Sequence, residues 1–184
     1  MKKHILFSLS VFFFGLANAQ VYSTSTGSVS FVSKTKFEEF SADNKQTQAA
    51  ISTDKGTVQF KLPINSFQFE KDLMQTHFQE NYMESATFPT SIFKGKIKNL
   101  SDVKFTTDGT YEVVVPGSLE MHGVTKEIEV KGNVVVKGKT ITLLADFSIE
   151  CSDYGIKIPK NNVSQVSNTI NIKVDCVLSP KRKK

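Results

Sequence analysis

The sequence predicts an all-β domain with one short helix: an antiparallel sheet of about eight strands, closed or nearly closed into a barrel. Apolar and polar residues alternate along residues 111–151, which is the period of a half-buried strand, and tight turns divide this stretch into three strands. The period lengthens to about 3.6 residues within residues 65–90. At 184 residues, the chain is long enough for one domain and short for two.

Residues 1–19 have the pattern of a secretory signal peptide. Basic residues precede the apolar run Ile5–Leu16, and Ala17-Asn18-Ala19 has the small-x-small form of a signal peptidase site. The run is well short of the roughly 20 residues that a membrane-spanning helix needs. We therefore expect cleavage after Ala19, export to the periplasm or outside the cell, a mature domain over residues 20–179 and a basic tail over residues 180–184.

The N-terminal part of the mature chain shows three strands. Residues 27–33 predict the first and residues 48–52 part of the second. Asp54-Lys55-Gly56 has the composition of a tight hairpin turn, because glycine tolerates the positive φ that such turns require. Residues 57–62 then alternate as a third strand, which Pro63 ends.

A short helix is predicted within residues 65–90. Asp72 is the expected N-cap, with Gln75 three residues later, and the apolar residues at helical spacing are Leu73, Met74, His77, Phe78, Tyr82 and Met83. A helix inserted between strands needs a surface on which to bury one face. The open end of a barrel offers that surface, so we expect a cap there, which either only covers the core or also borders a ligand entrance.

The remaining chain alternates as strands to its end. Phe93 and Ile97 share one face of residues 92–98, and Asp108-Gly109 turns the chain into the three-strand stretch. Gly123 and the segment 137–139 separate its strands, and residues 168–178 form the last strand.

The two cysteines, Cys151 and Cys176, both fall on the inward parity of their strands. In an exported protein a disulfide bond persists once formed, but bonding requires a short Cα–Cα distance across neighbouring strands. The sequence leaves open a disulfide between them or two buried thiols that act as small apolar side chains.

The charge distribution argues against nucleic acid as a partner. After removal of residues 1–19 the chain carries 21 basic and 18 acidic residues, and four of the basic ones are residues 181–184. The folded body is therefore close to neutral, whereas nucleic-acid recognition needs a basic face on the domain itself. The tail is either simply solvated or in peripheral contact with an anionic membrane surface. No pattern specifies the oligomeric state.

No catalytic or metal-binding motif stands out. The sequence has no HExxH, Cys-x-x-Cys, Gly-x-Ser-x-Gly or phosphate-binding glycine loop. His77 and His122 are far apart in the sequence, and a metal site built from them and a carboxylate such as Asp72 has little support. We therefore expect no enzyme activity, no metal and no cofactor.

Four segments, in order, resemble the YceI-like family of exported lipid-binding proteins. They are Lys71–Phe78 with Tyr82-Met83, Phe88-Pro89 followed by Phe93-Lys94-Gly95, Gly117–Lys126 with its Gly-Val-Thr-Lys sequence, and Asp153-Tyr154-Gly155-Ile156. The resemblance spans nearly the whole mature chain. It implies a lipocalin-like antiparallel barrel with a helical cap and an apolar lumen that holds an isoprenoid-type lipid, such as a polyprenyl or quinone tail.

The chain departs from the family pattern at positions that bear on the lipid head group. Tyr22 stands where the family often has tryptophan, Lys71 where it often has arginine, and no arginine precedes Asp153. The alternative to a binding protein is a ligand-free structural or protein-interaction domain, and a hydrolase or isomerase ranks third. The inward rows and the helix supply the candidate ligand-binding residues: Phe31, Phe60, Phe67, Leu73, His77, Phe78, Phe93, Val113, Val115, Leu119, Ile128, Val130, Leu143, Ala145, Phe147, Ile149, Ile170 and Ile172.

Overall fold

The computed structural model describes residues 20–181 and consists mainly of antiparallel strands. The expected signal peptide, residues 1–19, and residues 182–184 of the expected tail lie outside the described residues. The strands are β1 (Val21–Lys34), β2 (Glu39–Ser52), β3 (Thr57–Pro63), β4 (Phe67–Phe69), β5 (Thr90–Lys96), β6 (Gly109–Met121), β7 (Val124–Lys137), β8 (Thr140–Glu150) and β9 (Thr169–Pro180).

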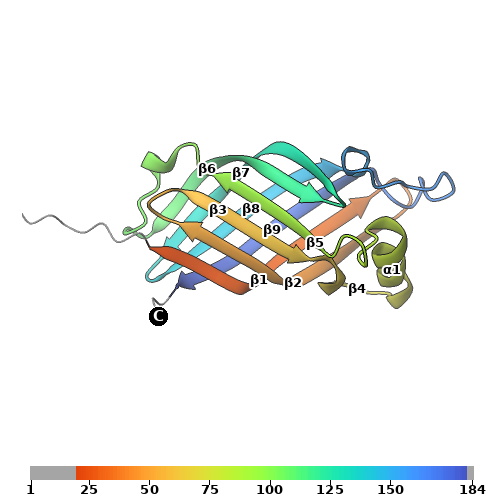
Figure 1. Ribbon diagram of the computed structural model, residues 1–184, viewed down its shortest axis with the longest axis horizontal. Coiled ribbons are helices and arrows are strands. Elements are labelled where there is room, and N and C mark those ends of the chain that lie inside the picture. Colours follow the sequence, from red (N-terminus) through yellow and green to blue (C-terminus); the bar gives the residue numbers. More distant parts are fainter. Residues whose placement is uncertain (1–19, 182–184) are drawn as a thin grey trace, which may run out of the picture.

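Eight of these strands close into a barrel. Hydrogen-bonded neighbours follow the order β1-β9-β8-β7-β6-β5-β3-β2, and β1 pairs with β2 to complete the ring. The short strand β4 pairs only with β2, outside the ring. The predicted all-β fold with about eight barrel strands and one short helix is confirmed (Figure 1). Closure leaves the barrel without an unpaired edge strand.

The connections divide between two ends of the barrel. One end, here called the mouth, carries the β1–β2 turn, the capping segment (residues 64–89), the β6–β7 turn and the loop of residues 151–168. The other, called the closed end, carries the β2–β3 and β7–β8 turns, a short 3₁₀ turn (Leu100–Asp102) and the end of β9. Figure 1 shows α1 and the blue 151–168 loop at one end of the barrel and the arrowhead of β9 at the opposite end.

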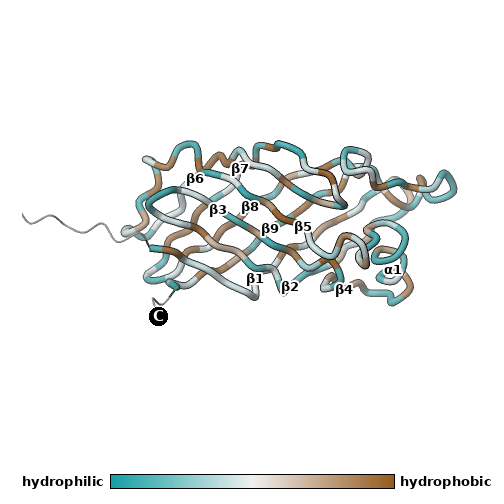
Figure 2. The backbone as a smooth tube through the Cα atoms, in the orientation of Figure 1, coloured by the Kyte–Doolittle hydropathy of each residue, from teal (hydrophilic) through white to brown (hydrophobic). Residues whose placement is uncertain are grey.

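Hydrophobic and hydrophilic residues alternate along the strands (Figure 2). The inward-facing ones form two clusters of buried side chains inside the barrel. The larger cluster fills the closed end, where Ile51, Ile141, Cys176 and Leu178 are at most 1% exposed. The smaller one lies near the mouth and includes Met121, Ile149, Cys151 and Tyr154. Between them the interior is less completely filled.

The first two strands are longer than the sequence predicts. β1 begins at Val21 rather than at residue 27, and β2, of which the sequence indicated only the part over residues 48–52, begins at Glu39. The register between them shifts at Gly27, which disturbs the apolar alternation of the first strand. In β2, buried Asn44 and Thr47 occupy inward positions where the pattern would show apolar residues. The Asn44 side chain is satisfied, because its Nδ2 donates to the Pro63 carbonyl oxygen at 2.8 Å.

The cysteines are both free and buried, which settles the open disulfide question against a bond. Cys176 pairs across the sheet with Leu143, which lies eight residues before Cys151 along the chain of β8. At about 3.3 Å per residue, that offset places the two thiols roughly 26 Å apart along the barrel. A disulfide needs Cα atoms within about 7 Å.

Candidate functional site

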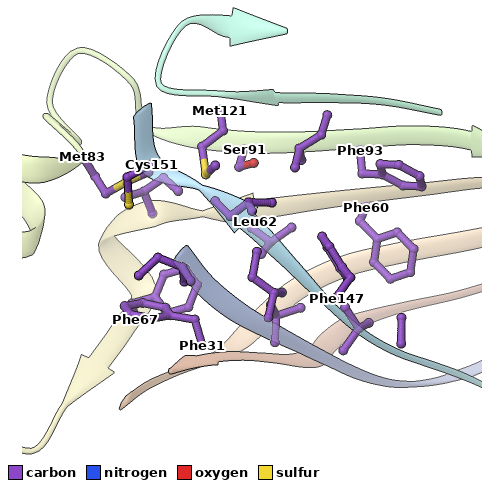
Figure 3. A pocket seen from close by; sticks show the side chains of 18 of the residues that line it. Phe31, Phe60, Leu62, Phe67, Met83, Ser91, Phe93, Met121, Phe147 and Cys151 are labelled. Carbon is purple, nitrogen blue, oxygen red and sulfur yellow. The ribbon is translucent and has the colours of Figure 1, made fainter. Parts of the chain in front are cut away.

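The inward faces of the strands enclose a cavity of about 390 Å³. All eight barrel strands and the capping segment contribute to its wall, and most of the wall is aliphatic or aromatic. Figure 3 shows Phe60, Phe93 and Phe147, which come from three strands, pointing into the same space. Small residues at Gly132 and Ala145 widen the cavity where β7 and β8 pair.

Room inside the barrel is visible in the exposure of inward residues. Ala145, Phe147 and Ile172 are each half-buried although they point inward, whereas Ile141, on the same row of β8, is 1% exposed. An inward residue that is not completely buried borders space rather than another side chain. The cavity therefore lies between the closed end, where side chains pack densely, and the mouth.

The cavity opens at the mouth and not at the closed end. At the mouth its wall includes exposed polar residues, among them Lys71, His77 and Gln165, whereas the closed end is filled by a cluster whose buried members are at most 8% exposed. Within residues 20–181, the site is thus a pocket with one entrance. Its interior is apolar and its entrance is polar.

A cluster of phenylalanines lies just inside this entrance. Phe31 of β1 stacks on Phe78 of the capping segment with ring centroids 5.5 Å apart and an interplanar angle of 26°. Phe67 meets both rings edge-on at centroid distances of 5.4 and 5.5 Å, and Phe40 and Phe69 extend the cluster. Aromatic pairs in these geometries add about 0.5–1.5 kcal/mol each beyond their buried area. The cluster attaches the capping segment to the barrel wall.

The helix of the capping segment differs from the prediction in its start and its inward face. Helix α1 (Asp72–His77) has Lys71 as its N-cap, without a side-chain capping bond, so Asp72 is the first helical residue and not the cap. A carboxylate in the first turn is still favourable because the helix dipole is positive there. A π-helical turn follows over Phe78–Tyr82, in which the Met83 amide donates to the Phe78 carbonyl oxygen at 2.8 Å.

The inward face of the capping segment is formed by its later residues. Phe78 and Tyr82 are half-buried and Met83 is 5% exposed, whereas Leu73, which the sequence grouped with them, is 66% exposed. At about 3.6 residues per turn, Leu73 lies about 140° from Phe78 and about 180° from Tyr82 around the helix, so it faces the other way. The wider π turn rotates the later residues relative to the six-residue α-helix. The capping segment therefore meets the barrel through its second half.

Two polar contacts join the capping segment to neighbouring loops at the mouth. Asn162 Nδ2, from the 151–168 loop, donates to the Tyr82 hydroxyl at 3.0 Å. His122, in the β6–β7 turn, has Nδ1 3.0 Å from the Tyr154 carbonyl oxygen and Nε2 3.6 Å from a Glu84 carboxylate oxygen. These contacts hold the cap, the turn and the loop together around the entrance.

The cavity wall holds few groups that could act chemically. The Ser91 hydroxyl donates to the Glu120 carbonyl oxygen at 2.8 Å. Burial, with a smaller effect of neighbouring Glu150, raises the pKa of the Cys151 thiol to about 11, so the thiol is protonated near neutral pH. Among residues 20–181, no group of three histidine, cysteine, aspartate or glutamate side chains is placed to hold a metal ion.

Most predicted site residues line this cavity. The candidates that contribute to the cavity wall include the inward rows of β6, β8 and β9 and the phenylalanines of β1, β3, β4 and β5. Val130 of β7, His77 and Phe78 also line the cavity. Leu73 does not, because it points to solvent, and neither does Ile128, which instead packs against the buried cluster near the mouth. The sequence reasoning missed wall residues on loops, including Glu38, Asn162, Gln165 and Val166, because no periodicity marks them.

The comparisons with known proteins agree with this architecture. The model of the YceI-like domain matches residues 18–178. No curated protein matches the chain. A polyisoprenoid-binding domain from Saccharophagus degradans implicated in plant cell wall breakdown is similar in structure, with a TM-score of 0.76 and 18% identity over 89% of this chain and 99% of that one.

Two further solved structures are similar. BcnA from Burkholderia cenocepacia has a TM-score of 0.68 and 19% identity, over 83% of this chain and 96% of that one. The YCEI protein of Campylobacter jejuni has a TM-score of 0.57 and 16% identity over the whole of both chains. At these identities, the likeness establishes a shared fold.

Proposed function

This chain belongs to the YceI-like family, and from that membership we propose that it is an exported binding protein that encloses the apolar chain of an isoprenoid-type lipid. The observation that carries the proposal is the apolar cavity of about 390 Å³ with a single polar entrance. Ligand pockets in proteins have this form: a concave, mostly apolar wall and a few polar groups that fix orientation.

The size of the cavity sets how much lipid it encloses. At about 30 Å³ for a group the size of a water molecule, it accommodates roughly 13 methylene-sized groups. Burying about that many carbons is worth roughly 10 kcal/mol before the costs of ordering the chain, which is sufficient for micromolar binding or better. A longer polyprenyl chain would extend out through the mouth.

The polarity of the two ends sets the orientation of the ligand. The closed end presents only packed apolar side chains and excludes a polar head group, because an unpaired polar group there would lose its hydrogen bonds with water. The mouth offers Lys71, His77, Tyr82 and Asn162 as hydrogen-bonding groups. On this ground we propose that the apolar tail lies inward and the head group at the entrance.

We propose binding without a chemical step. A protonated Cys151 thiol and a Ser91 hydroxyl that donates to a backbone carbonyl oxygen are poor nucleophiles, and this supports the proposal. Export through residues 1–19 is part of it as well, and the mature chain should begin at Gln20. Among residues 20–181, no helix is long and apolar enough to cross a bilayer.

Native mass spectrometry of the exported protein, purified without detergent, tests the function. We expect about one lipid per chain, identified by solvent extraction and mass analysis, and a protein mass that corresponds to Gln20 as first residue. A protein that carries no lipid and takes up no dispersed isoprenoid would support the alternative of a ligand-free interaction domain. A mass that still includes residues 1–19 would contradict export by cleavage.

A further inference from the structure

Large apolar side chains in contact with water gather at the mouth. Within residues 20–181, four large hydrophobic residues are prominently exposed, and three of them lie on mouth elements: Phe37 at 82%, Leu73 at 66% and Val163 at 60%. The fourth, Val177, is on the outer wall of β9 near the closed end. Single exposed apolar residues are ordinary, but three around one opening are not distributed at random over the surface.

Two of these residues belong to loops that are bonded to each other. Phe37 lies in the turn of residues 35–38 and Val163 in the 151–168 loop. The Thr35 hydroxyl donates to the Ser164 carbonyl oxygen at 2.7 Å, and the Ser167 amide donates to the Ser33 hydroxyl at 3.0 Å. The two loops form one projection, here called the lip (residues 35–38 and 157–168), with an apolar side chain on each part.

The lip borders the entrance of the cavity. Glu38, next to Phe37 in the chain, and Asn162, next to Val163, both contribute to the cavity wall, as does Gln165. Any surface that the lip contacts is therefore adjacent to the opening through which a ligand enters or leaves.

The charges on the lip favour an anionic surface. Lys36, Lys157 and Lys160 are exposed, and within the described residues none of them is in an ion pair. The one acidic residue of the lip, Glu38, is half-buried, so the lip keeps a net positive charge. Near α1 the exposed charges are mainly acidic, with Glu70, Asp72 and Glu80. Apolar side chains that insert into the interface, flanked by lysines that reach phosphate groups, are the composition of peripheral membrane anchors.

We propose that the lip docks this protein on an anionic phospholipid bilayer, with Phe37 and Val163 inserted at the interface, so that the cavity entrance faces the lipid. The docking itself does not depend on the proposed function. Only its interpretation, that a lipid passes between the bilayer and the cavity, rests on that function. A protein partner fits less well, because one small projection does not provide the roughly 1,000 Å² that a specific protein interface buries. β9, after which the basic tail follows in the sequence, ends at the closed end, away from the lip.

Co-sedimentation with vesicles tests the docking, using the full mature chain. Wild-type protein is mixed with phosphatidylcholine vesicles that contain phosphatidylglycerol, and separately with pure phosphatidylcholine. We expect the double variant Phe37→Ser/Val163→Ser to bind the anionic vesicles at least about tenfold more weakly. The free energy of a tenfold change in binding is smaller than the free energy gained by burying one such side chain. The triple variant Lys36→Gln/Lys157→Gln/Lys160→Gln should bind anionic vesicles no better than neutral ones.

Three controls distinguish binding through the lip from binding through another part of the chain. Val177→Ser removes an exposed valine far from the mouth and should leave vesicle binding unchanged. Replacing residues 181–184 by glutamine should also leave most binding intact. Circular dichroism and uptake of detergent-dispersed isoprenoid should be unaltered in the double variant, which shows that the barrel and its cavity are intact.

The outcomes are decisive in both directions. Docking through the lip is overturned by wild-type protein that does not bind anionic vesicles, by a double variant that binds as well as wild type, by loss of binding in the tail variant, or by lip-dependent self-association without lipid. Uptake of isoprenoid by a protein that ignores vesicles would leave the proposed function intact. Lip-dependent vesicle binding without any lipid uptake would instead overturn the proposed function alone.

Discussion

Replacing Ala145 by tryptophan tests whether the middle of the barrel has room for a ligand. Ala145 points inward on β8, paired with Gly132 on β7 and Val174 on β9, and it borders the cavity. If the indole enters the cavity, about 100 Å² of apolar surface leaves water, worth about 2.5 kcal/mol at about 25 cal/mol per Å². That gain offsets the roughly 1–3 kcal/mol that local repacking costs.

The same substitution should act strongly on lipid binding. If the indole excludes about five carbons of a bound chain, at about 0.8 kcal/mol each, the affinity falls by about 4 kcal/mol, or roughly a thousandfold. Stability and binding thus separate: the free energy of unfolding of lipid-free variant stays within about 1 kcal/mol of wild type or rises, while co-purified lipid is largely lost.

The control places the same substitution in the packed closed end. Ala49 is 3% exposed within the buried cluster there, and Ala49→Trp should lose roughly 1–3 kcal/mol or more through overpacking. Denaturant unfolding of the delipidated proteins measures the difference. The chain has no natural tryptophan, so fluorescence reports the introduced indole alone. Equal destabilisation by the two substitutions would refute the cavity, and a stable Ala145→Trp protein that still carries its lipid would refute the cavity as the lipid site.

Three further predictions concern the entrance, the thiols and the barrel wall. Phe78→Asp should speed lipid exchange, because it removes the ring that stacks on Phe31 of the barrel, and it should change the far-ultraviolet strand signal little. Equal losses of lipid retention and of strand signal would identify the capping segment as ordinary core. Burial is the main cause that raises the pKa values of Cys151 and Cys176 from 9.0 to about 11, so the stability that these thiols contribute is complete below pH 9 and is lost as pH rises through 11. Native protein at about pH 8 should therefore react with a thiol reagent only after unfolding. Rapid labelling of the native protein would contradict this. Gly117→Ala should destabilise by about 1–3 kcal/mol, because its Cβ would collide with the Lys94 carbonyl oxygen of β5. A neutral result in denaturant unfolding would show that the strands can separate there.

Where alternation is unbroken, sequence reasoning predicted the fold and the wall well. The row that contains Leu143, Ala145, Phe147 and Ile149 could be assigned to the interior because a strand has only two faces and one was consistently apolar. The same reasoning missed the first part of β2, because polar Asn44 stands at an inward position and interrupts the apolar row. Its side chain is buried at no cost in lost hydrogen bonds only because the folded chain brings the Pro63 carbonyl oxygen to it.

The entrance was predicted less well than the wall. Leu73 was expected inside because it recurs at helical spacing with His77, but Phe78 and Tyr82 form the face that contacts the barrel, and they lie on the other side of the helix from Leu73. The π-helical turn over Phe78–Tyr82 was not foreseen either. Glu38, Asn162 and Gln165 reach the cavity from loops that meet only when the barrel closes. Their positions depend on contacts between distant parts of the chain, which a local pattern does not contain.

The dense packing of the closed end has a kinetic consequence for any ligand. With one opening, an arriving chain cannot displace a resident chain from behind, so the resident molecule must leave before its successor enters. Replacement is then limited by departure, and its rate should be independent of how much competing lipid is supplied. The filled end of the barrel, which touches no ligand, would in this way determine the order of events at the other.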